Sequence, residues 1–267
     1  MRSKRDISFK KILSLFRHQN GSPFFNAKGL AIGVFSGCFP FFGFQTLIGI
    51  FFQAIFLGLF IYLPAWTLYW LDALIWAAVF YSINSVACIY LLLTNPESIE
   101  ARLNLPSPDQ PRQDKLATTI LFSAMAVSLI ACPLDVFHFQ ITPVFTGPLK
   151  IFGMAVFVLG LLLIIASMAA NEFAESTVNI QEDRGQEVVD KGLYAFVRHP
   201  MYTGFILFFV GTSLWLGTVL SLAICITCMT VGLVLRIRVE EKTLLEGLEG
   251  YREYTKKVRF RLIPFLI

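Results

Sequence analysis

The feature that most constrains this chain is a series of long apolar segments. Six stretches are apolar and long enough to cross about 30 Å of hydrocarbon, namely 29–63, 66–94, 116–134, 147–170, 201–217 and 218–237. Soluble domains carry roughly 25% charged residues because their surfaces face water, whereas charged residues make up only 15% of this chain. This composition excludes an ordinary soluble enzyme, a disordered protein and a nucleic-acid-binding module. We expect an all-α, polytopic integral membrane protein with about six transmembrane helices.

The basic residues predict the orientation of the chain in the membrane. Of the 22 Lys and Arg, all but Lys150 lie before Gly29, in 95–115, in 171–200 or from Arg236 onward. Six crossings would place these four groups on the same side. Because cytoplasmic loops are enriched in Lys and Arg, we predict that both termini are cytoplasmic.

Two polar patches flank the last apolar hairpin, 201–235. Arg198–Tyr202 enters the hairpin and Arg236–Glu241 follows it. A hairpin brings its two ends together, so both patches should meet at the cytoplasmic membrane face. Arg236 and Glu240 are four residues apart and would share one face of a helix. Charged residues at a membrane boundary also arise from anchoring alone, and that reading stays open for these patches.

The cysteines do not predict a metal site. All five lie inside or at the edge of apolar spans. Cys225 and Cys228 are spaced like half of a zinc site, but no second pair or nearby His completes the set. We therefore predict that they are small buried residues and that the chain binds no metal.

Three linked motifs in the last hundred residues carry a family resemblance. Gly192–Gly204 reads GLYAFVRHPMYTG and matches the signature GxYxxxRHPxYxG. Arg236–Glu241 (RIRVEE), Tyr251–Tyr254 (YREY) and Arg261–Pro264 (RLIP) match a C-terminal signature in order and spacing. The chain resembles the isoprenylcysteine carboxyl methyltransferase family, within a wider group of membrane methyltransferases that includes phospholipid N-methyltransferases.

The resemblance also divides the chain. It predicts a membrane methyltransferase domain over 59–267, with the signature region at 171–267. Residues 1–58 would form a basic N-terminus and a Gly- and Phe-rich membrane segment, which is overlong and broken at Pro40. We interpret it as one spanning helix plus an interfacial or re-entrant piece. Within it, Ser22–Leu57 resembles the first half of a small bacterial membrane domain of unknown function, and we assign it no chemistry.

The resemblance implies a methyl transfer that uses S-adenosylmethionine (AdoMet) and a lipophilic, membrane-embedded acceptor. The cofactor pocket would be formed by the C-terminal helical hairpin and its flanking cytoplasmic segments. Glu240 would bind the cationic amino group of AdoMet, and Arg236 would face a carboxylate on the acceptor, because a guanidinium fork binds both carboxylate oxygens. Arg236 and His199 are the implied catalytic residues. The implied cofactor-binding residues are Gln181, Gln186, Glu187, Val188, Val189, Tyr194, His199, Pro200, Met201, Tyr202 and Glu240.

Several alternatives stay open. A carboxylate is already ionised at neutral pH and needs no general base, whereas an amine acceptor, as in phospholipid N-methyltransferases, would need one from Glu241 or His199. Helix phase does not decide between Glu240 and Glu241 as the residue that faces the cofactor. The chain could instead be a non-enzymatic structural or transport-accessory protein, and a reductase group with a similar C-terminal pattern leaves nicotinamide binding as a further alternative.

The expected partners and location follow from the same resemblance. The partners would be membrane lipids and a lipophilic small-molecule or lipidated acceptor, with no nucleic acid. The stretch Ile180–Val189 fits the prokaryotic members of the family. We therefore predict an integral protein of the inner (plasma) membrane of a prokaryote.

Overall fold

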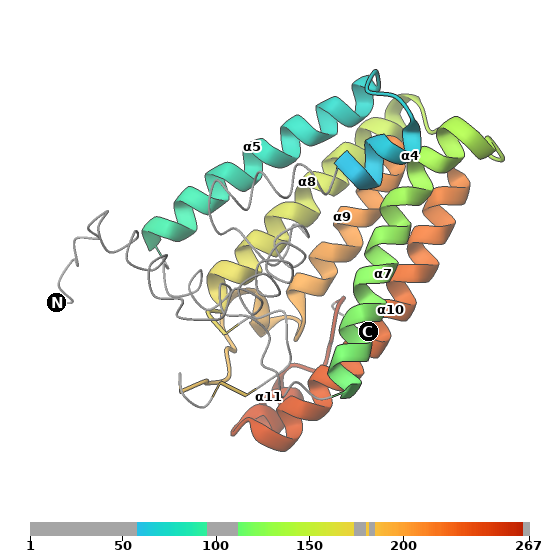
Figure 1. Cartoon of the computed structure of the whole chain (residues 1–267). Coiled ribbons are helices and arrows are strands. Elements are labelled where there is room, and N and C mark those ends of the chain that lie inside the picture. Colours follow the sequence, from blue (N-terminus) through green and yellow to red (C-terminus); the bar gives the residue numbers. More distant parts are fainter. Residues whose placement is uncertain (1–57, 95–111, 174–179, 182–184, 264–267) are drawn as a thin grey trace, which may run out of the picture.

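In a computed structural model, the chain forms helices that run up and down between two ends of the molecule (Figure 1). The structure describes residues 58–94, 112–173, 180–181 and 185–263. The long helices are α5 (Leu71–Thr94), α7 (Arg112–Leu134), α8 (Gly147–Ala170), α9 (Pro200–Leu216) and α10 (Val219–Gly247). The short elements are the π-helical turns η1 (Gly58–Tyr62) and η2 (Asp135–Phe139), the α-helices α4 (Leu63–Ala65) and α11 (Tyr251–Lys257), and the 3-10 turn η4 (Gly192–Ala195). Within the described residues, β structure is confined to an isolated bridge between Val144 and Thr218, which confirms the all-α prediction.

The helices have the length and composition of membrane spans. Among the described residues, three helical runs are long and apolar enough to cross a membrane: Arg112–Phe139, Gly147–Ala170 and Val219–Gly247. Two more, Leu71–Ala87 and Pro200–Leu216, are apolar but shorter. The chain is thus an integral membrane protein. The first predicted segment, 29–63, lies mostly outside the described residues together with Pro40, so the count of six spans and the cytoplasmic termini stay predictions.

One predicted boundary is wrong. The apolar span was expected to begin at residue 116, but α7 already begins at Arg112. Hydropathy leaves Asp114 outside the apolar segment because it is charged. In the structure its side chain is 1% exposed and accepts a hydrogen bond from Arg236 of α10. This ion pair keeps a charged residue inside the helical bundle, so the helix starts a turn earlier than its apolar part.

Helices α8 and α9 pack closely because glycines face each other across their contact. A Cβ atom added at Gly160 would lie 2.8 Å from the carbonyl oxygen of Gly204. A Cβ atom added at Gly211 would lie 2.7 Å from the carbonyl oxygen of Gly153. Small residues let membrane helices approach until their backbones touch. These two glycine pairs therefore fix the position of α9 against α8. Helix α9 begins at Pro200, within the Gly192–Gly204 motif.

The turn between α9 and α10 is held by a buried polar cluster. Thr218 caps α10 by a reciprocal exchange of hydrogen bonds with Ser221, which satisfies backbone donors at the helix start. The Thr218 hydroxyl also donates to Asp135, whose other oxygen accepts from the backbone amide of Ile141 at 3.0 Å. The cluster closes the turn between α9 and α10, which form the predicted hairpin, and ties this turn to η2.

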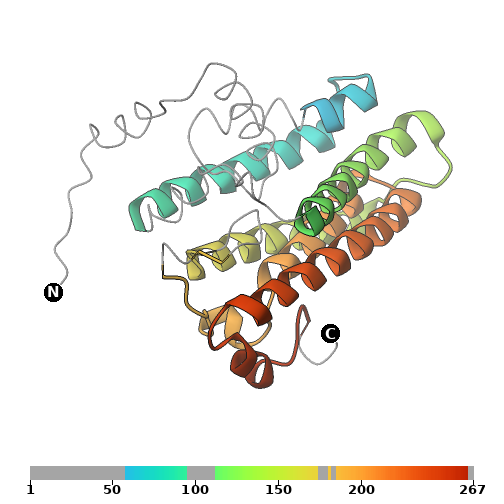
Figure 2. The same cartoon turned by 60° about the horizontal axis from the view of Figure 1, so that its bottom comes forward.

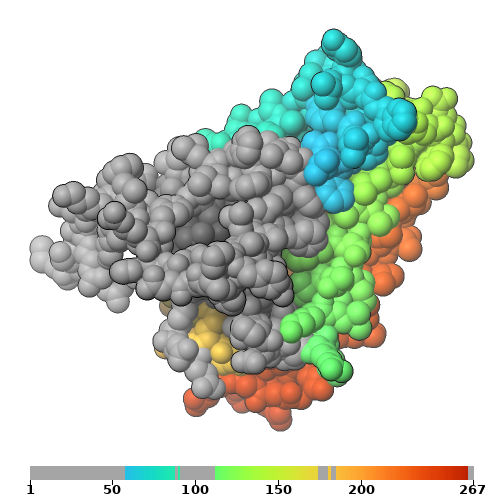
Figure 3. Space-filling model, in the orientation of Figure 1, coloured from blue at the N-terminus to red at the C-terminus, as the bar shows by residue number. Residues whose placement is uncertain are grey.

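The arrangement brings the polar ends of several helices to one end of the molecule. α8 lies beside α9, and α7 lies beside α10, in both views (Figures 1 and 2). The C-terminal ends of α8 and α10 and the N-terminal ends of α7 and α9 point toward α11. η1 and α4 lie at the opposite end (Figure 3). The two patches that flank the last hairpin therefore meet beside α11.

Candidate active site

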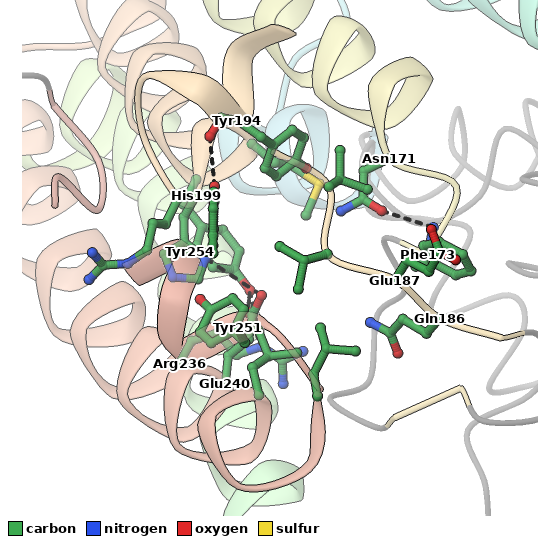
Figure 4. A pocket seen from close by; sticks show the side chains of 17 residues that line it. Asn171, Phe173, Gln186, Glu187, Tyr194, His199, Arg236, Glu240, Tyr251 and Tyr254 are labelled. Carbon is green, nitrogen blue, oxygen red and sulfur yellow. Dashed lines mark hydrogen bonds and ion pairs between the residues drawn. The ribbon is translucent and has the colours of Figure 1, made fainter. Parts of the chain in front are cut away.

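A pocket opens at the α11 end, between the segment that follows α8, the start of α9 and the end of α10 (Figure 4). Its space, with the open mouth included, amounts to about 800 Å³. The side chains that line it are Asn171, Phe173, Gln186, Glu187, Val188, Val189, Tyr194, Arg198, His199, Met201, Tyr202, Arg236, Glu240, Leu244, Leu248, Tyr251 and Tyr254.

Arg198 fastens the C-terminal tail to the start of α9. Its backbone amide donates to the carbonyl of Phe260 at 2.9 Å. Its guanidinium donates to the carbonyls of Val258 and Arg259 at 2.8 and 2.9 Å. Its Nε also donates to Glu241 Oε1 at 2.7 Å. Arg198 of the Gly192–Gly204 motif therefore holds the C-terminal tail against the start of α9.

His199 lies between two carboxylates at the first turn of α9. Its Nε2 is 3.3 Å from Glu241 Oε1, and its Nδ1 is 3.6 Å from Glu240 Oε1. Burial by itself would lower the pKa of His199, but the hydrogen bonds and charges of Glu240 and Glu241 outweigh burial and raise the pKa above its ordinary value. An opposite charge at this distance favours the charged form of a side chain. The two carboxylates thus stabilise the protonated form of His199 relative to that of an ordinary histidine.

Arg236 connects three helices at the floor of the pocket. It is 4% exposed, and its terminal nitrogen donates to Asp114 and, at 2.6 Å, to the Thr118 hydroxyl of α7. Its Nε donates to the Tyr202 hydroxyl at 3.3 Å, and that hydroxyl donates to Glu240 Oε2. Because each group is orientated by the next, this chain of contacts holds Arg236, Tyr202 and Glu240 in a fixed geometry.

Tyrosines form the wall toward α11. The Tyr254 hydroxyl donates to the carbonyl of Tyr194 at 2.7 Å. Tyr251 is 4% exposed, and its hydroxyl has no hydrogen-bond partner in the part of the chain that the structure describes. Burial raises the pKa of both Tyr251 and Tyr254 above the ordinary value for a phenol. A buried hydroxyl without a partner is costly, so a ligand that bonds Tyr251 would gain an interaction already orientated for it.

The structure brings together most of the residues that the sequence predicted for the cofactor. Gln181 and Pro200 do not line the pocket. Gln181 donates its backbone amide to Gln186 Oε1 at 2.8 Å and so supports the wall from behind, and Pro200 is the first residue of α9. The residues that do line it are Gln186, Glu187, Val188, Val189, Tyr194, His199, Met201, Tyr202, Arg236 and Glu240. Their functional roles stay predictions.

The helix phase separates the two neighbouring glutamates. Glu240 lines the pocket, and its side chain is 24% exposed. Glu241 instead lines a second hollow on another face of α10, while its carboxylate bonds Arg198 and, at 2.8 Å, Arg261. Glu240 is therefore the glutamate that a bound molecule would meet.

Sequence reasoning did not assign Asp114 to the site, nor several residues that line the pocket, namely Asn171, Phe173, Arg198, Leu244, Leu248, Tyr251 and Tyr254. Asp114 is separated from Arg236 by 122 positions, and the only signal was an acidic residue just before an apolar segment. Tyr251 belongs to the YREY motif, but nothing in that pattern says which of its tyrosines reaches the pocket. Both placements depend on tertiary packing, which a single sequence does not specify.

Metal ligands do not gather in the part of the chain that the structure describes. Among those residues, no group of three or more His, Cys, Asp or Glu is placed to hold a metal ion. Cys225 is buried and Cys228 is half-buried in α10. The spacing of these two cysteines is thus accounted for by helix packing.

Comparison with known proteins identifies the segment that builds this pocket. The family model described as phospholipid methyltransferase matches residues 149–249, which cover α8, α9 and α10. Residues 149–249 are thus similar to the phospholipid methyltransferase family. The resemblance to membrane methyltransferases is thereby confirmed over this segment, whereas Ser22–Leu57 lies outside the described residues and its resemblance stays a prediction.

Curated relatives extend the match. The chain is 33% identical over 153 residues to the protein-S-isoprenylcysteine O-methyltransferase of Saccharomyces cerevisiae, which covers 54% of this chain and 63% of the relative. It is 31% identical over 94 residues to the protein of the same name in Schizosaccharomyces pombe, covering 35% and 40%. The chain thus spans less than two thirds of the length of either relative.

A solved structure is also similar. It is the eukaryotic intramembrane Ras methyltransferase ICMT (isoprenylcysteine carboxyl methyltransferase), solved without a monobody. The match has a TM-score of 0.49 and 21% sequence identity, and it covers 96% of this chain and 91% of the other. The site described above rests on the residues of this chain and not on that likeness.

Proposed function

We propose that this membrane methyltransferase domain transfers the methyl group of AdoMet to a carboxylate on a lipophilic acceptor, forming a methyl ester. The observation that carries the proposal is the joint presence of Glu240 and Arg236 in one pocket at the polar end of apolar helices. The names of the two yeast relatives support an isoprenylated cysteine as the acceptor.

The donors and surfaces of the pocket fit AdoMet. Glu240 would bind the cationic amino group, because a carboxylate has acceptor capacity beyond the Tyr202 bond that it already accepts. The apolar side chains of Val188, Leu244 and Leu248 offer a surface for the adenine ring. The buried hydroxyl of Tyr251 would gain the partner that it lacks among the described residues.

Bound AdoMet supplies an electrophilic methyl group on a sulfonium sulfur. The work left to the protein is to hold donor and acceptor in line, a contribution that positioning alone can make large. Arg236 would hold the acceptor carboxylate, and Asp114 and Thr118 orientate its guanidinium. Because the acceptor is already ionised, none of these residues has to remove a proton from it.

Two observations favour a second candidate, methyl transfer to an amine. The guanidinium of Arg236 is already paired with Asp114, and the matching family model is that of phospholipid methyltransferases. An amine acceptor would require a base to accept its proton. Of the two predicted bases, Glu241 lines a different hollow and His199 lines the pocket. His199 could accept the proton only from its neutral form, which the neighbouring Glu241 at 3.3 Å disfavours.

The experiment that tests the proposal uses methyl-labelled AdoMet and the purified full chain in lipid vesicles. One sample receives an S-farnesylcysteine derivative with a free carboxylate, and the matched control receives the same compound with that carboxylate converted to an amide. Mild alkali then releases ester-bound label as methanol. We expect volatile label from the carboxylate compound alone.

Other outcomes would redirect the account. Label that remains on vesicle phosphatidylethanolamine after alkali would replace the ester proposal with N-methylation. AdoMet that binds without transfer to either compound or to the vesicle lipid would contradict the proposed acceptor class. A chain that binds no AdoMet at all would refute the methyltransferase assignment itself.

A further inference from the structure

A second hollow lies on a different face of α10 from the cofactor pocket. The α10 residues of the cofactor pocket are Arg236, Glu240 and Leu244, which recur every four positions on one helix face. The second hollow shares no lining residue with the first. Its space, measured with its open mouth, is about 1440 Å³. We call it the basic groove, and its lining residues are Val234, Ile237, Arg238, Glu241, Lys242, Leu245, Glu246, Arg252, Arg261 and Leu262.

Cations outnumber anions in the basic groove. Of its two acidic side chains, Glu241 already accepts from Arg198 and Arg261. Within the residues that the structure describes, Arg238, Lys242 and Arg252 enter no ion pair, and all three are exposed. The second acidic side chain, Glu246, offsets one of these charges. Four cations therefore face two carboxylates in the lining of the groove, which leaves positive charge in excess.

The groove changes from apolar to basic along the helix axis. Val234 belongs to the apolar part of α10 and is 39% exposed. Arg238 and Lys242 follow it at successive intervals of four residues, about 6 Å apart along the axis, on the same face. A glycerophospholipid in a bilayer presents its groups in the same order, with acyl chains first and the phosphate about one helical turn further out.

We propose that the basic groove binds one anionic glycerophospholipid of the surrounding leaflet. Its phosphate contacts Arg238, Lys242 and Arg252, and its acyl chains cover Val234 and neighbouring apolar side chains. A soluble anion would use the cations but leave the apolar wall exposed, and a zwitterionic lipid would leave the excess charge unbalanced. Juxtamembrane Lys and Arg each contribute about 1 kcal/mol to binding of anionic lipid, which suits a groove with this charge.

One side chain, Glu241, connects the basic groove to the cofactor pocket. Glu241 lines the groove, and its carboxylate contacts Arg198 and His199, which line the pocket. Arg261 bonds the same carboxylate from the groove side. A lipid headgroup in the groove would therefore lie beside the Arg261–Glu241 pair, and Glu241 in turn contacts the first turn of α9.

The test measures lipid retention and does not depend on methyl transfer. The full chain is reconstituted with equal amounts of phosphatidylglycerol and phosphatidylcholine, extracted in mild detergent and weighed by native mass spectrometry. We expect one retained phosphatidylglycerol in preference to phosphatidylcholine. The double variant Arg238→Gln/Lys242→Gln should lower that preference about 25-fold, which is two charges at about 1 kcal/mol each.

A matched variant removes the same charge outside the groove. Lys256 and Arg259 are exposed at the same end of the molecule but do not line the groove, so Lys256→Gln/Arg259→Gln should keep the preference. Equal losses in both double variants would overturn the proposal, since they would show a general surface effect. Retention of both lipids without a headgroup preference would overturn it, and so would displacement of the lipid by soluble glycerol phosphate.

Discussion

Replacing Glu240 by Gln removes one negative charge from the proposed cofactor site, and with it one of the two carboxylates beside His199. The side chain keeps its size, and the amide oxygen can still accept the hydrogen bond from Tyr202. What disappears is the carboxylate that faces the pocket with 24% of its surface exposed. If this group binds the amino group of AdoMet, affinity should fall while the fold is retained.

The expected size follows from the type of contact. A hydrogen bond between charged partners contributes about 1.5–3 kcal/mol, and each 1.4 kcal/mol is a factor of ten in Kd. Glu240→Gln should therefore raise the Kd for AdoMet by roughly ten- to hundredfold. Partial exposure to water places the expected value toward the lower end of that range.

Isothermal titration calorimetry of the full chain in detergent measures this Kd directly. The matched control is Glu253→Gln, because Glu253 is an exposed acid of α11 at the same end of the molecule and does not line the pocket. The control should bind like the original chain. Unchanged affinity in Glu240→Gln, with an unchanged thermal unfolding temperature, would refute the role given to this carboxylate.

Further predictions concern the acceptor, the pH dependence and the packing. Arg236→Ala should reduce the rate of methyl transfer more than the affinity for AdoMet. Equal losses of rate and affinity would mean that Arg236 binds the cofactor or stabilises the fold, and does not hold the acceptor. Asp114→Asn should lower the free energy of unfolding by about 3 kcal/mol, because breaking a buried ion pair costs about 3–5 kcal/mol and Asn keeps one hydrogen bond; thermal unfolding measures it. Folding raises the pKa of His199, so the contribution of this residue to the free energy of unfolding is complete below its ordinary pKa of 6.5 and is lost as the pH rises through its pKa in the folded protein. His199→Gln should therefore lose less stability than the original chain as the pH rises above about 6.5, as measured by thermal unfolding at a series of pH values. Gly160→Ala should cost about 1–3 kcal/mol of stability through overpacking, whereas Gly58→Ala, where an added Cβ meets nothing within 4 Å, should not.

Much of the architecture was predictable because a membrane imposes simple rules. Long apolar stretches must become helices, since every backbone polar group in hydrocarbon needs an internal partner. Helices α5, α7, α8, α9 and α10 accordingly occupy the predicted segments from 66 onward. The meeting of the two polar patches was also predictable, because a hairpin places its ends side by side.

The finer geometry of the site depends on tertiary contacts. The Asp114–Arg236 ion pair joins helices far apart in sequence, and α7 accordingly begins at Arg112, ahead of the predicted span 116–134. The choice between Glu240 and Glu241 depends on the rotation of α10, which Arg198 and the C-terminal tail fix by binding Glu241. Gln181 does not line the pocket, and its hydrogen bonds instead support two lining residues, Gln186 and Phe173.

The most direct test of the central claim locates bound AdoMet on the chain. Ultraviolet light crosslinks methyl-labelled AdoMet to residues in contact with it, and peptide mapping by mass spectrometry identifies them, with excess S-adenosylhomocysteine as competitor. The account predicts competitor-sensitive label in 186–202 or in 236–254, the two stretches that form most of the pocket. Label confined to α5 or α7, or label that the competitor does not reduce, would contradict it.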